Sequence, residues 1–323
     1  MDTLSKVLEC VRCDSAGFIE AEFAAPWNLR SSFGRRGLIE RVPPGAHIVG
    51  FCFMVEGRCK VQQEGSSAVE EAVAGDLLLF LGKNRYLIGS DLRMLPLDEP
   101  DASVAPAVAR AAPPRSADGG AAGPTRIVFC SIACSPSMVR ALLESMPPFV
   151  RIPGSGDDDV SGLRELLRIG VLESRAARPG VDSALARLSE LVLVDALRRY
   201  AENVPPAGQG WLAASRDERI GRALALMHAE PHRAWTLDEL ARNVALSRSA
   251  LADRFARLVG QPPMRYLTRW RLALAAQTLR SGAEAIVRIA ERAGYDSDAA
   301  FSRAFQREFG VPPARWRRGR ALA

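Results

Sequence analysis

The chain has 323 residues, of which 48% are hydrophobic and 25% are charged. These values are typical of globular proteins, and they exclude a fibrous chain or one disordered throughout. No stretch approaches the ~20 apolar residues that a membrane helix needs, and the N-terminal segment lacks the apolar core of a signal peptide. We therefore expect a cytoplasmic protein of two domains with no membrane contact.

Basic charge is concentrated in the C-terminal third of the chain. Residues 215–323 hold 20 arginines, no lysine and 11 acidic residues, a net charge of +9, whereas the remainder carries −3. Guanidinium groups match phosphate oxygens and guanine edges, so this distribution favours nucleic acid as a partner. The whole chain has only three lysines, so the use of arginine in this region is not evidence for a nucleic-acid partner. The uneven distribution of charge still supports that partner.

The N-terminal half contains short apolar runs separated by turn residues. After a short helix, strands are expected at residues 18–27, 46–62, 76–89 and 125–134. The run AHIVGFCFMVEGRCKVQ predicts a strand that turns at Glu56-Gly57 and returns as a hairpin. Short strands at even spacing with glycine turns indicate an antiparallel β-barrel or jelly roll.

Residues 98–124 are rich in Ala, Pro and Gly, so we expect a flexible loop that interrupts the first domain. Two helices are expected within residues 157–202. The apolar stripe of the second is wider than one packing partner requires, so the pair packs on its own domain or on a second subunit. Residues 203–214, which contain two prolines and two glycines, are expected to form the linker to the C-terminal domain.

The C-terminal region contains one local pattern twice. The recurring residues are Ser247, Phe255, Gly260, Pro262 and Pro263 in the first copy and Ser297, Phe305, Gly310, Pro312 and Pro313 in the second. Each copy predicts a helix, a turn and a second helix that begins at a serine cap and ends at the glycine. Such a helix-turn-helix unit lays its second helix in a DNA major groove, and two units joined by a helix at residues 263–279 read two successive grooves.

The doubled unit resembles the DNA-binding domain of the AraC/XylS family of bacterial transcription regulators, through IAERAGYDSDAAFSRAFQREFGVPPARWR and its weaker first copy. The earlier part resembles the cupin-like sensor domain of one branch of that family, through FCFMVEGRCKV, AGDLLLFLG and GWLAASRDERIGRALALMHAEP. The resemblance implies a multi-domain α+β protein. A cupin-like antiparallel β-barrel with helices is expected over residues 1–202, and an all-α domain with two helix-turn-helix units is expected over residues 215–323.

The resemblance also implies a homodimer that binds double-stranded promoter DNA, acts with RNA polymerase, and activates or represses transcription. The candidate DNA contacts are Ser247, Arg248, Ser249, Ala252, Asp253, Arg269, Ser297, Asp298, Ala299, Ala300, Ser302, Arg303 and Arg307. Among the base-facing positions only Arg303 can make a bidentate contact with guanine, worth ~1–3 kcal/mol of discrimination. Arg265 and Arg271 are further candidates for phosphate contacts.

Cupins that catalyse reactions hold a metal with two or three histidines and a carboxylate. The chain has three histidines, of which only His47 falls in the expected barrel, and Cys52 and Tyr86 stand where related sensor domains carry histidine. His228 and His232 are four residues apart, but Pro231 between them ends the helix, so no zinc pair is expected. We therefore expect no metal, no cofactor and no catalytic residue, which leaves a metal-dependent cupin enzyme as the least favoured alternative.

The second alternative is a regulator that senses oxidation through its thiols. The cysteines are Cys10, Cys13, Cys52, Cys59, Cys130 and Cys134, all in the N-terminal half. Cys52 and Cys59 are expected across the hairpin from each other, but a cysteine on a strand is more often a small buried hydrophobe. The signal, a small molecule or a redox change, is left open, with the six cysteines and Tyr86 as candidate sensing residues.

Overall fold

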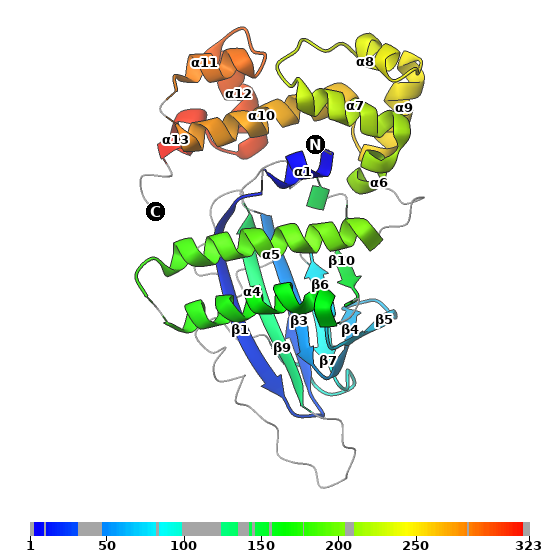
Figure 1. Ribbon diagram of the computed structural model, residues 1–323, viewed down its shortest axis with the longest axis vertical. Helices are drawn as coiled ribbons and strands as arrows, with labels where there is room; N and C mark the ends of the chain where they lie inside the picture. Colours follow the sequence, from blue (N-terminus) through cyan, green and yellow to red (C-terminus); the bar gives the residue numbers. More distant parts are fainter. Residues whose placement is uncertain are drawn as a thin grey trace. The chain divides into compact units, whose positions relative to one another are not determined.

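The computed structural model describes residues 3–9, 11–31, 47–81, 84–98, 124–134, 142–143, 146–154, 157–176, 178–203, 210–282 and 284–318. The chain divides into two compact units (Figure 1). The sheet unit comprises residues 12–135 and 147–203, and the helical unit comprises residues 1–11, 136–146 and 204–323. No helix among the described residues is both long enough and apolar enough to cross a membrane. The predicted loop, apart from its two end residues, lies outside the described residues.

Two five-stranded sheets form the sheet unit. Sheet A has the order β1 (Cys13–Phe23), β9 (Thr125–Cys134), β3 (His47–Glu56), β6 (Leu77–Phe80) and β10 (Phe149–Ile152). Sheet B has the order β5 (Val69–Val73), β4 (Arg58–Gln63), β7 (Tyr86–Gly89), β2 (Asn28–Ser31) and β8 (Leu97–Asp98). The described strand pairs are antiparallel except for β2 with β8. This architecture confirms the predicted fold class.

The core of the sheet unit draws side chains from both sheets. Sheet A contributes Met54 and Phe80, sheet B contributes Val61 and Tyr86, and each of the four is at most 3% exposed. Because side chains alternate between the two faces of a strand, one face of each sheet supplies this core. The apolar runs that predicted the strands therefore supply the residues of this core.

The turn at Glu56-Gly57 forms as predicted, but the hairpin prediction is wrong. β3 pairs with β6 and β9, whereas β4 pairs with β5 and β7, so the chain crosses from sheet A to sheet B at this turn. Gly57 has a φ of +80°, and a Cβ there would come within 2.8 Å of the Pro124 carbonyl oxygen. Glycine is therefore required both by the backbone conformation and by the available space. The sequence pattern of two strands joined by a tight turn is the same whether the strands pair with each other or belong to different sheets.

Two helices, α4 (Asp157–Ala176) and α5 (Val181–Asn203), pack against β1 of sheet A (Figure 1). Gly170 of α4 lies on the ring of Phe18, where a Cβ would meet ring atoms at 2.8 Å. Glu190 of α5 accepts a hydrogen bond from the backbone N–H of Cys13 at 3.1 Å. The pair thus packs on its own unit and still leaves Leu172 and Leu191 49% and 54% exposed.

The helical unit contains two helix-turn-helix units and the helices around them. α1 (Thr3–Leu8), α6 (Trp211–Arg216) and α7 (Glu218–Ala229) pack beside the first unit, which is formed by α8 (Leu237–Asn243) and α9 (Arg248–Val259). α10 (Pro263–Ser281) leads to the second unit, formed by α11 (Ile286–Arg292) and α12 (Asp298–Phe309), and α13 (Pro313–Arg318) follows. The predicted all-α C-terminal domain with a doubled helix-turn-helix is confirmed.

Two short segments belong to the helical unit, although the predicted domain boundaries place them outside the DNA-binding domain. Helix α1 contacts α6 and α7, and its Val7 is 1% exposed, so the N-terminal residues pack within the helical unit. Residues 211–214, expected to be linker, begin α6 and are buried. In both cases a short apolar segment packs against a helix distant in sequence, and such a contact leaves no local pattern.

His228 lies in an aromatic cluster of the helical unit. Its ring stacks on Trp270 with centroids 4.1 Å apart, and its Nε2 lies 2.8 Å from the hydroxyl of Tyr266. Burial lowers the pKa of His228 from 6.5 to about 3, and the charge of Lys6 contributes a smaller decrease. His232 is exposed and donates to the Arg292 carbonyl oxygen at 2.6 Å, so the two histidines have separate structural roles.

The helical unit should lose stability as the pH falls below 6.5. The folded state keeps His228 neutral down to a pH of about 3, whereas the unfolded chain binds a proton near pH 6.5. Acid therefore favours unfolding by at most about 1.4 kcal/mol per pH unit in this window, and the full contribution is present above it. Urea unfolding at pH 7 and pH 5, followed by tryptophan fluorescence, measures the change. His228→Phe should remove this part of the pH dependence, and an unchanged dependence would contradict the assignment.

Candidate nucleic-acid interface

The first helix-turn-helix unit begins and ends at capping residues. The Thr236 hydroxyl accepts the Glu239 backbone N–H at 3.1 Å at the start of α8, and Ser247 accepts the Ala250 N–H at 3.2 Å at the start of α9. Gly260 ends α9 in the left-handed conformation with a φ of 80°. Each cap satisfies backbone groups that the helix itself leaves unpaired, so these residues fix the helix ends.

The second unit repeats these caps and has an aromatic inner face. Ser297 accepts the Ala300 N–H at 3.2 Å, and Gly310 ends α12 with a φ of 77°. The ring of Phe305 is 0% exposed and lies 5.5 Å from Phe301, 4.4 Å from Phe309 and 5.8 Å from Trp316 between centroids. These rings hold α12 against α10 and α13, which leaves its opposite face in solvent.

The turns of the two units differ by one residue. Each turn contains one residue with left-handed backbone, Ala245 in the first with a φ of 52° and Gly294 in the second with a φ of 79°. The second turn has one more residue, Asp296, before its capping serine. Because glycine adopts this conformation without a Cβ clash, the first turn is the more strained of the two.

The predicted DNA contacts lie on the outer faces of the second helices or at their N-terminal caps. Exposed side chains are Ser247, Arg248, Ser249, Asp253, Ser297, Asp298, Ala299, Arg303 and Arg307, and half-buried ones are Ala252, Ala300 and Ser302. Arg248 lies 3.5 Å from the carboxylate of Asp238, a contact between two well-exposed groups that costs little to break. Apart from the arginines, the side chains on these faces are short, and some of them are acidic.

Two arginines of α10 are held by contacts inside the helical unit. Arg269 lies 2.8 Å from the carboxylate of Glu308, and its side chain is 21% exposed. Arg271 donates to the carbonyl oxygens of Pro231 and Arg233 at 2.6 and 2.7 Å. In the structure the guanidinium groups of both residues, which were expected to contact phosphate, form these intramolecular bonds. Helical periodicity alone does not show that these sides of α10 meet other elements.

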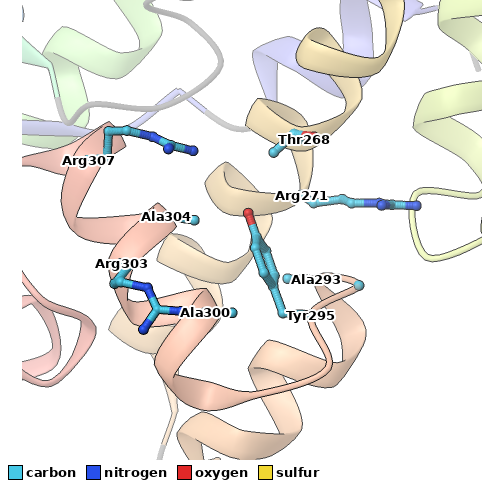
Figure 2. Close-up of a pocket in the computed structure, with 9 residues that line it drawn as sticks. Thr268, Arg271, Ala293, Tyr295, Ala300, Arg303, Ala304 and Arg307 are labelled. Carbon is cyan, nitrogen blue, oxygen red and sulfur yellow. The ribbon is translucent and has the colours of Figure 1, made fainter.

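A pocket of about 400 Å³ lies between α10, α12 and the turn before α12 (Figure 2). It is lined by Thr268, Arg271, Ala293, Gly294, Tyr295, Ala300, Arg303, Ala304 and Arg307. Arg303 and Arg307 are one helical turn apart on α12, and within the described part of the chain neither side chain forms a hydrogen bond or an ion pair. Burial raises the pKa of Tyr295, so its hydroxyl remains a neutral donor at physiological pH. Arg303, Arg307 and Tyr295 offer hydrogen-bond donors to DNA, and Tyr295 and Thr268 are lining residues that the sequence pattern did not single out.

The candidate sensing cysteines that the structure describes are buried and form no disulfide. This holds for Cys13, Cys52, Cys59, Cys130 and Cys134, whereas Cys10 lies outside the described residues. Burial raises the pKa of Cys59 to about 12 and holds the pKa of Cys130 well above its ordinary value. Both are therefore protonated at neutral pH and react slowly with oxidants. The thiols pack as small hydrophobic groups, and the redox-sensor alternative is not supported.

Cys52 and Tyr86 both belong to the core between the sheets. Cys52 is 0% exposed on β3, and Cys59 on β4 approaches the Met54 sulfur at 3.6 Å. The Tyr86 hydroxyl donates to the Pro148 carbonyl oxygen at 3.2 Å, and burial raises its pKa. At the two positions where related domains carry histidine, the side chains pack in the interior of this unit.

Comparison with known proteins matches both parts of the chain. A family model described as a cupin matches residues 2–202, and one described as a helix-turn-helix domain matches residues 240–319. A putative AraC-like transcription regulator of Streptomyces lividans is 32% identical over 272 residues, which cover 84% of this chain and 87% of that protein. The HTH-type transcriptional regulator AlkR of Acinetobacter baylyi is 33% identical over 184 residues, 56% of this chain and 59% of that protein.

A solved structure also resembles part of the chain. The crystal structure of a transcriptional regulator with an AraC-type DNA-binding domain, from Chromobacterium violaceum, is 30% identical with a TM-score of 0.32. It covers 34% of this chain and 97% of its own. The cupin match spans more than half of the chain, and the Streptomyces relative extends over both domains. The chain belongs to the AraC-like transcription regulators, with a cupin domain followed by a DNA-binding helix-turn-helix domain.

Proposed function

We propose that this regulator binds promoter DNA by placing α9 and α12 in two successive major grooves. The observation that carries the proposal is the pair of capped helices with solvent-facing outer sides, joined by one helix of 19 residues. At 1.5 Å per residue that helix is about 28 Å long, close to the ~34 Å between successive turns of the major groove. Base contacts would come from Ser249, Ala252, Asp253, Asp298, Ala299, Ala300 and Arg303.

Phosphate contacts supply most of the affinity in this proposal. Arg248 and Arg307 are exposed, and the serines at or near the helix N-termini, Ser247, Ser297 and Ser302, can donate to phosphate oxygens. The acidic side chains of Asp253 and Asp298 oppose phosphate and can only accept hydrogen bonds, for example from cytosine N4. Specificity should therefore depend strongly on the second unit.

Arg303→Ala should relax recognition at one base pair of the bound duplex. Loss of a bidentate contact to guanine is expected to reduce discrimination there by ~1–3 kcal/mol, about 5- to 150-fold. Competition among duplexes that differ at single positions measures the change. Arg307→Ala, one turn away, should instead weaken binding to every duplex similarly and lower the salt slope by about 1. Equal weakening of all duplexes by Arg303→Ala would contradict a base contact.

The homodimer and the cytoplasmic location remain predictions, and we propose the outer side of α4 and α5 as the dimer contact. Ile169, Leu172 and Leu191 are 38%, 49% and 54% exposed on this helix pair, and a second copy would remove these apolar groups from water. Light scattering of the purified protein should give twice the chain mass of 35.0 kDa. A single-chain mass at micromolar concentration would contradict the proposal.

The cupin domain is proposed to sense a small-molecule signal and to catalyse no reaction. Among the described residues no group of three or more His, Cys, Asp and Glu side chains is placed to hold a metal ion. Signal binding would change how the two DNA-binding arms of a dimer engage their half-sites, and RNA polymerase would be the partner at the promoter. Stoichiometric iron, nickel or manganese in the purified protein would contradict the non-enzymatic role.

A further inference from the structure

The two helix-turn-helix units share a single covalent connection through α10. For both to enter successive grooves of one duplex, the angle between them has to match the helical repeat of DNA. A helix alone fixes its own axis, but the side chains at its two ends decide how each unit is held against it. One loop, between the end of α7 and the start of α8, contacts both α10 and the second unit. These contacts therefore matter for recognition.

Arg271 connects this loop to the linking helix. From α10 its Nε donates to the Pro231 carbonyl oxygen at 2.6 Å, and its Nη2 donates to the Arg233 carbonyl oxygen at 2.7 Å. Figure 2 shows its side chain directed away from Arg303 and Arg307, toward the yellow-green loop. The guanidinium thus donates hydrogen bonds to two backbone oxygens of the loop between α7 and α8.

The same guanidinium and loop also reach the second unit. A Cβ placed on Gly294, in the turn before α12, would lie 2.9 Å from Nη1 of Arg271, so the guanidinium packs on this glycine. His232, between the two residues that Arg271 holds, donates from Nδ1 to the Arg292 carbonyl oxygen at 2.6 Å, at the end of α11. The loop is therefore bonded to α10 and to α11 at once.

On its other side the loop is anchored to the first unit. The Arg233 side chain lies 3.0 Å from Glu230 and 2.7 Å from Glu239 of α8, and its guanidinium carbon is 4.0 Å from the ring centroid of Trp235. Trp235 is 4% exposed and donates from Nε1 to the Glu230 carbonyl oxygen at 3.0 Å. Bonds to Arg271 and Arg292 on one side and to Glu239 of α8 on the other make the loop a bridge.

We propose that Arg271 is a positioning residue that fixes the orientation of the two helix-turn-helix units and thereby the spacing that the protein accepts between the two major-groove sites of one chain. Arg271 touches no base in this role. Without it, α10 still joins the units, but the bridge loses the two bonds that hold the loop on the helix. The units then reorient more freely, and the variant tolerates spacings that the native protein rejects. The inference rests on the proposed binding of two successive grooves.

The test compares spacing preference in the full-length protein. A preferred duplex is first selected from random DNA with the native protein, and versions are made with one or two base pairs inserted between the two major-groove sites of one chain. Each inserted pair shifts the second groove site by about 3.4 Å and rotates it by about 34°. The native protein should lose ~10²-fold in affinity on a two-pair insertion, because two rigidly linked sites no longer bind together. Arg271→Met, which keeps the apolar stem, should lose less than ~10-fold on the same insertion.

Matched variants separate positioning from charge and from folding. Arg222→Met removes one exposed arginine from α7 in the same unit, and it should keep the native spacing preference while binding all duplexes slightly more weakly. His232→Ala removes one exposed side chain of the bridge and should show an intermediate loss of spacing preference. It decides the outcome if Arg271→Met does not fold, as judged by urea unfolding.

The two proposals fail in different ways. If selection with the native protein yields no preferred duplex, the proposed two-groove binding fails before any variant is compared. If a preferred duplex exists and Arg271→Met and His232→Ala keep the full native penalty for insertion, the positioning role of Arg271 is overturned and DNA recognition stands. The spacing penalty is the informative quantity, because a merely destabilised domain would lose affinity for every spacing alike.

Discussion

Phe305→Ala should unfold the second helix-turn-helix unit and abolish DNA binding. Phe305 is 0% exposed and its ring lies within 5.8 Å, between centroids, of three other aromatic rings. Truncation of a buried phenylalanine costs about 3–5 kcal/mol through lost burial and the cavity that remains. Because this is a large share of the stability of a small helical domain, α12 should no longer be held in place.

Urea unfolding and DNA binding of the same preparations measure this effect. Val287→Ala is the matched control, because Val287 lies on α11 of the same unit and is 51% exposed. It should change the free energy of unfolding by no more than about 0.5 kcal/mol and leave DNA binding intact. A Phe305→Ala protein as stable as this control would show that the aromatic inner face does not hold the unit together.

Asp76→Ala should destabilise the sheet unit by about 3 kcal/mol. Asp76 is 2% exposed, and its carboxylate accepts hydrogen bonds from Arg151 at 2.8 Å and from the backbone N–H groups of Val73 and Gly154 at 2.9 and 3.2 Å. Alanine leaves a guanidinium and two backbone donors without their acceptor. The effect lies toward the low end of buried-pair values because the Arg151 side chain is 32% exposed and water reaches it.

Asp91→Ala provides the comparison in the same unit. Its carboxylate also has an arginine partner, Arg93 at 3.7 Å, but that side chain is 95% exposed. Such a surface pair contributes about 0–1 kcal/mol, so the control should unfold close to the native midpoint. The two variants lose the same charge, and thermal or urea unfolding that shifts equally in both would contradict the buried role of Asp76.

Features determined by neighbouring residues could be predicted from the sequence. Ser247 and Ser297 cap their helices, and Gly260 and Gly310 end them in the left-handed conformation, because each acts on backbone groups within a few residues. The apolar runs and the glycine turns between them predicted the strands of the sheet unit for the same reason. These local signals identified the doubled helix-turn-helix and the antiparallel architecture.

Features that depend on distant contacts could not be predicted in this way. A turn at Gly57 is visible in the sequence, but the separation of β3 and β4 into two sheets depends on β9, which follows some 70 residues later. Arg269 and Arg271 look like exposed cations on an amphipathic helix until Glu308 and the loop at Pro231 are placed beside them. The exposed outer side of α12 was predicted, whereas the bridge behind it was not.

The most direct measurement is the affinity of the full-length protein for its own upstream DNA and for random duplex of the same length, over a range of salt concentrations. Sequence-specific binding through two grooves predicts a preference of at least ~10³-fold for the specific duplex. Phosphate contacts through arginine predict that the logarithm of the binding constant falls linearly with the logarithm of salt concentration. Equal affinity for both duplexes at every salt concentration would contradict the assignment of α9 and α12 as readers of promoter DNA.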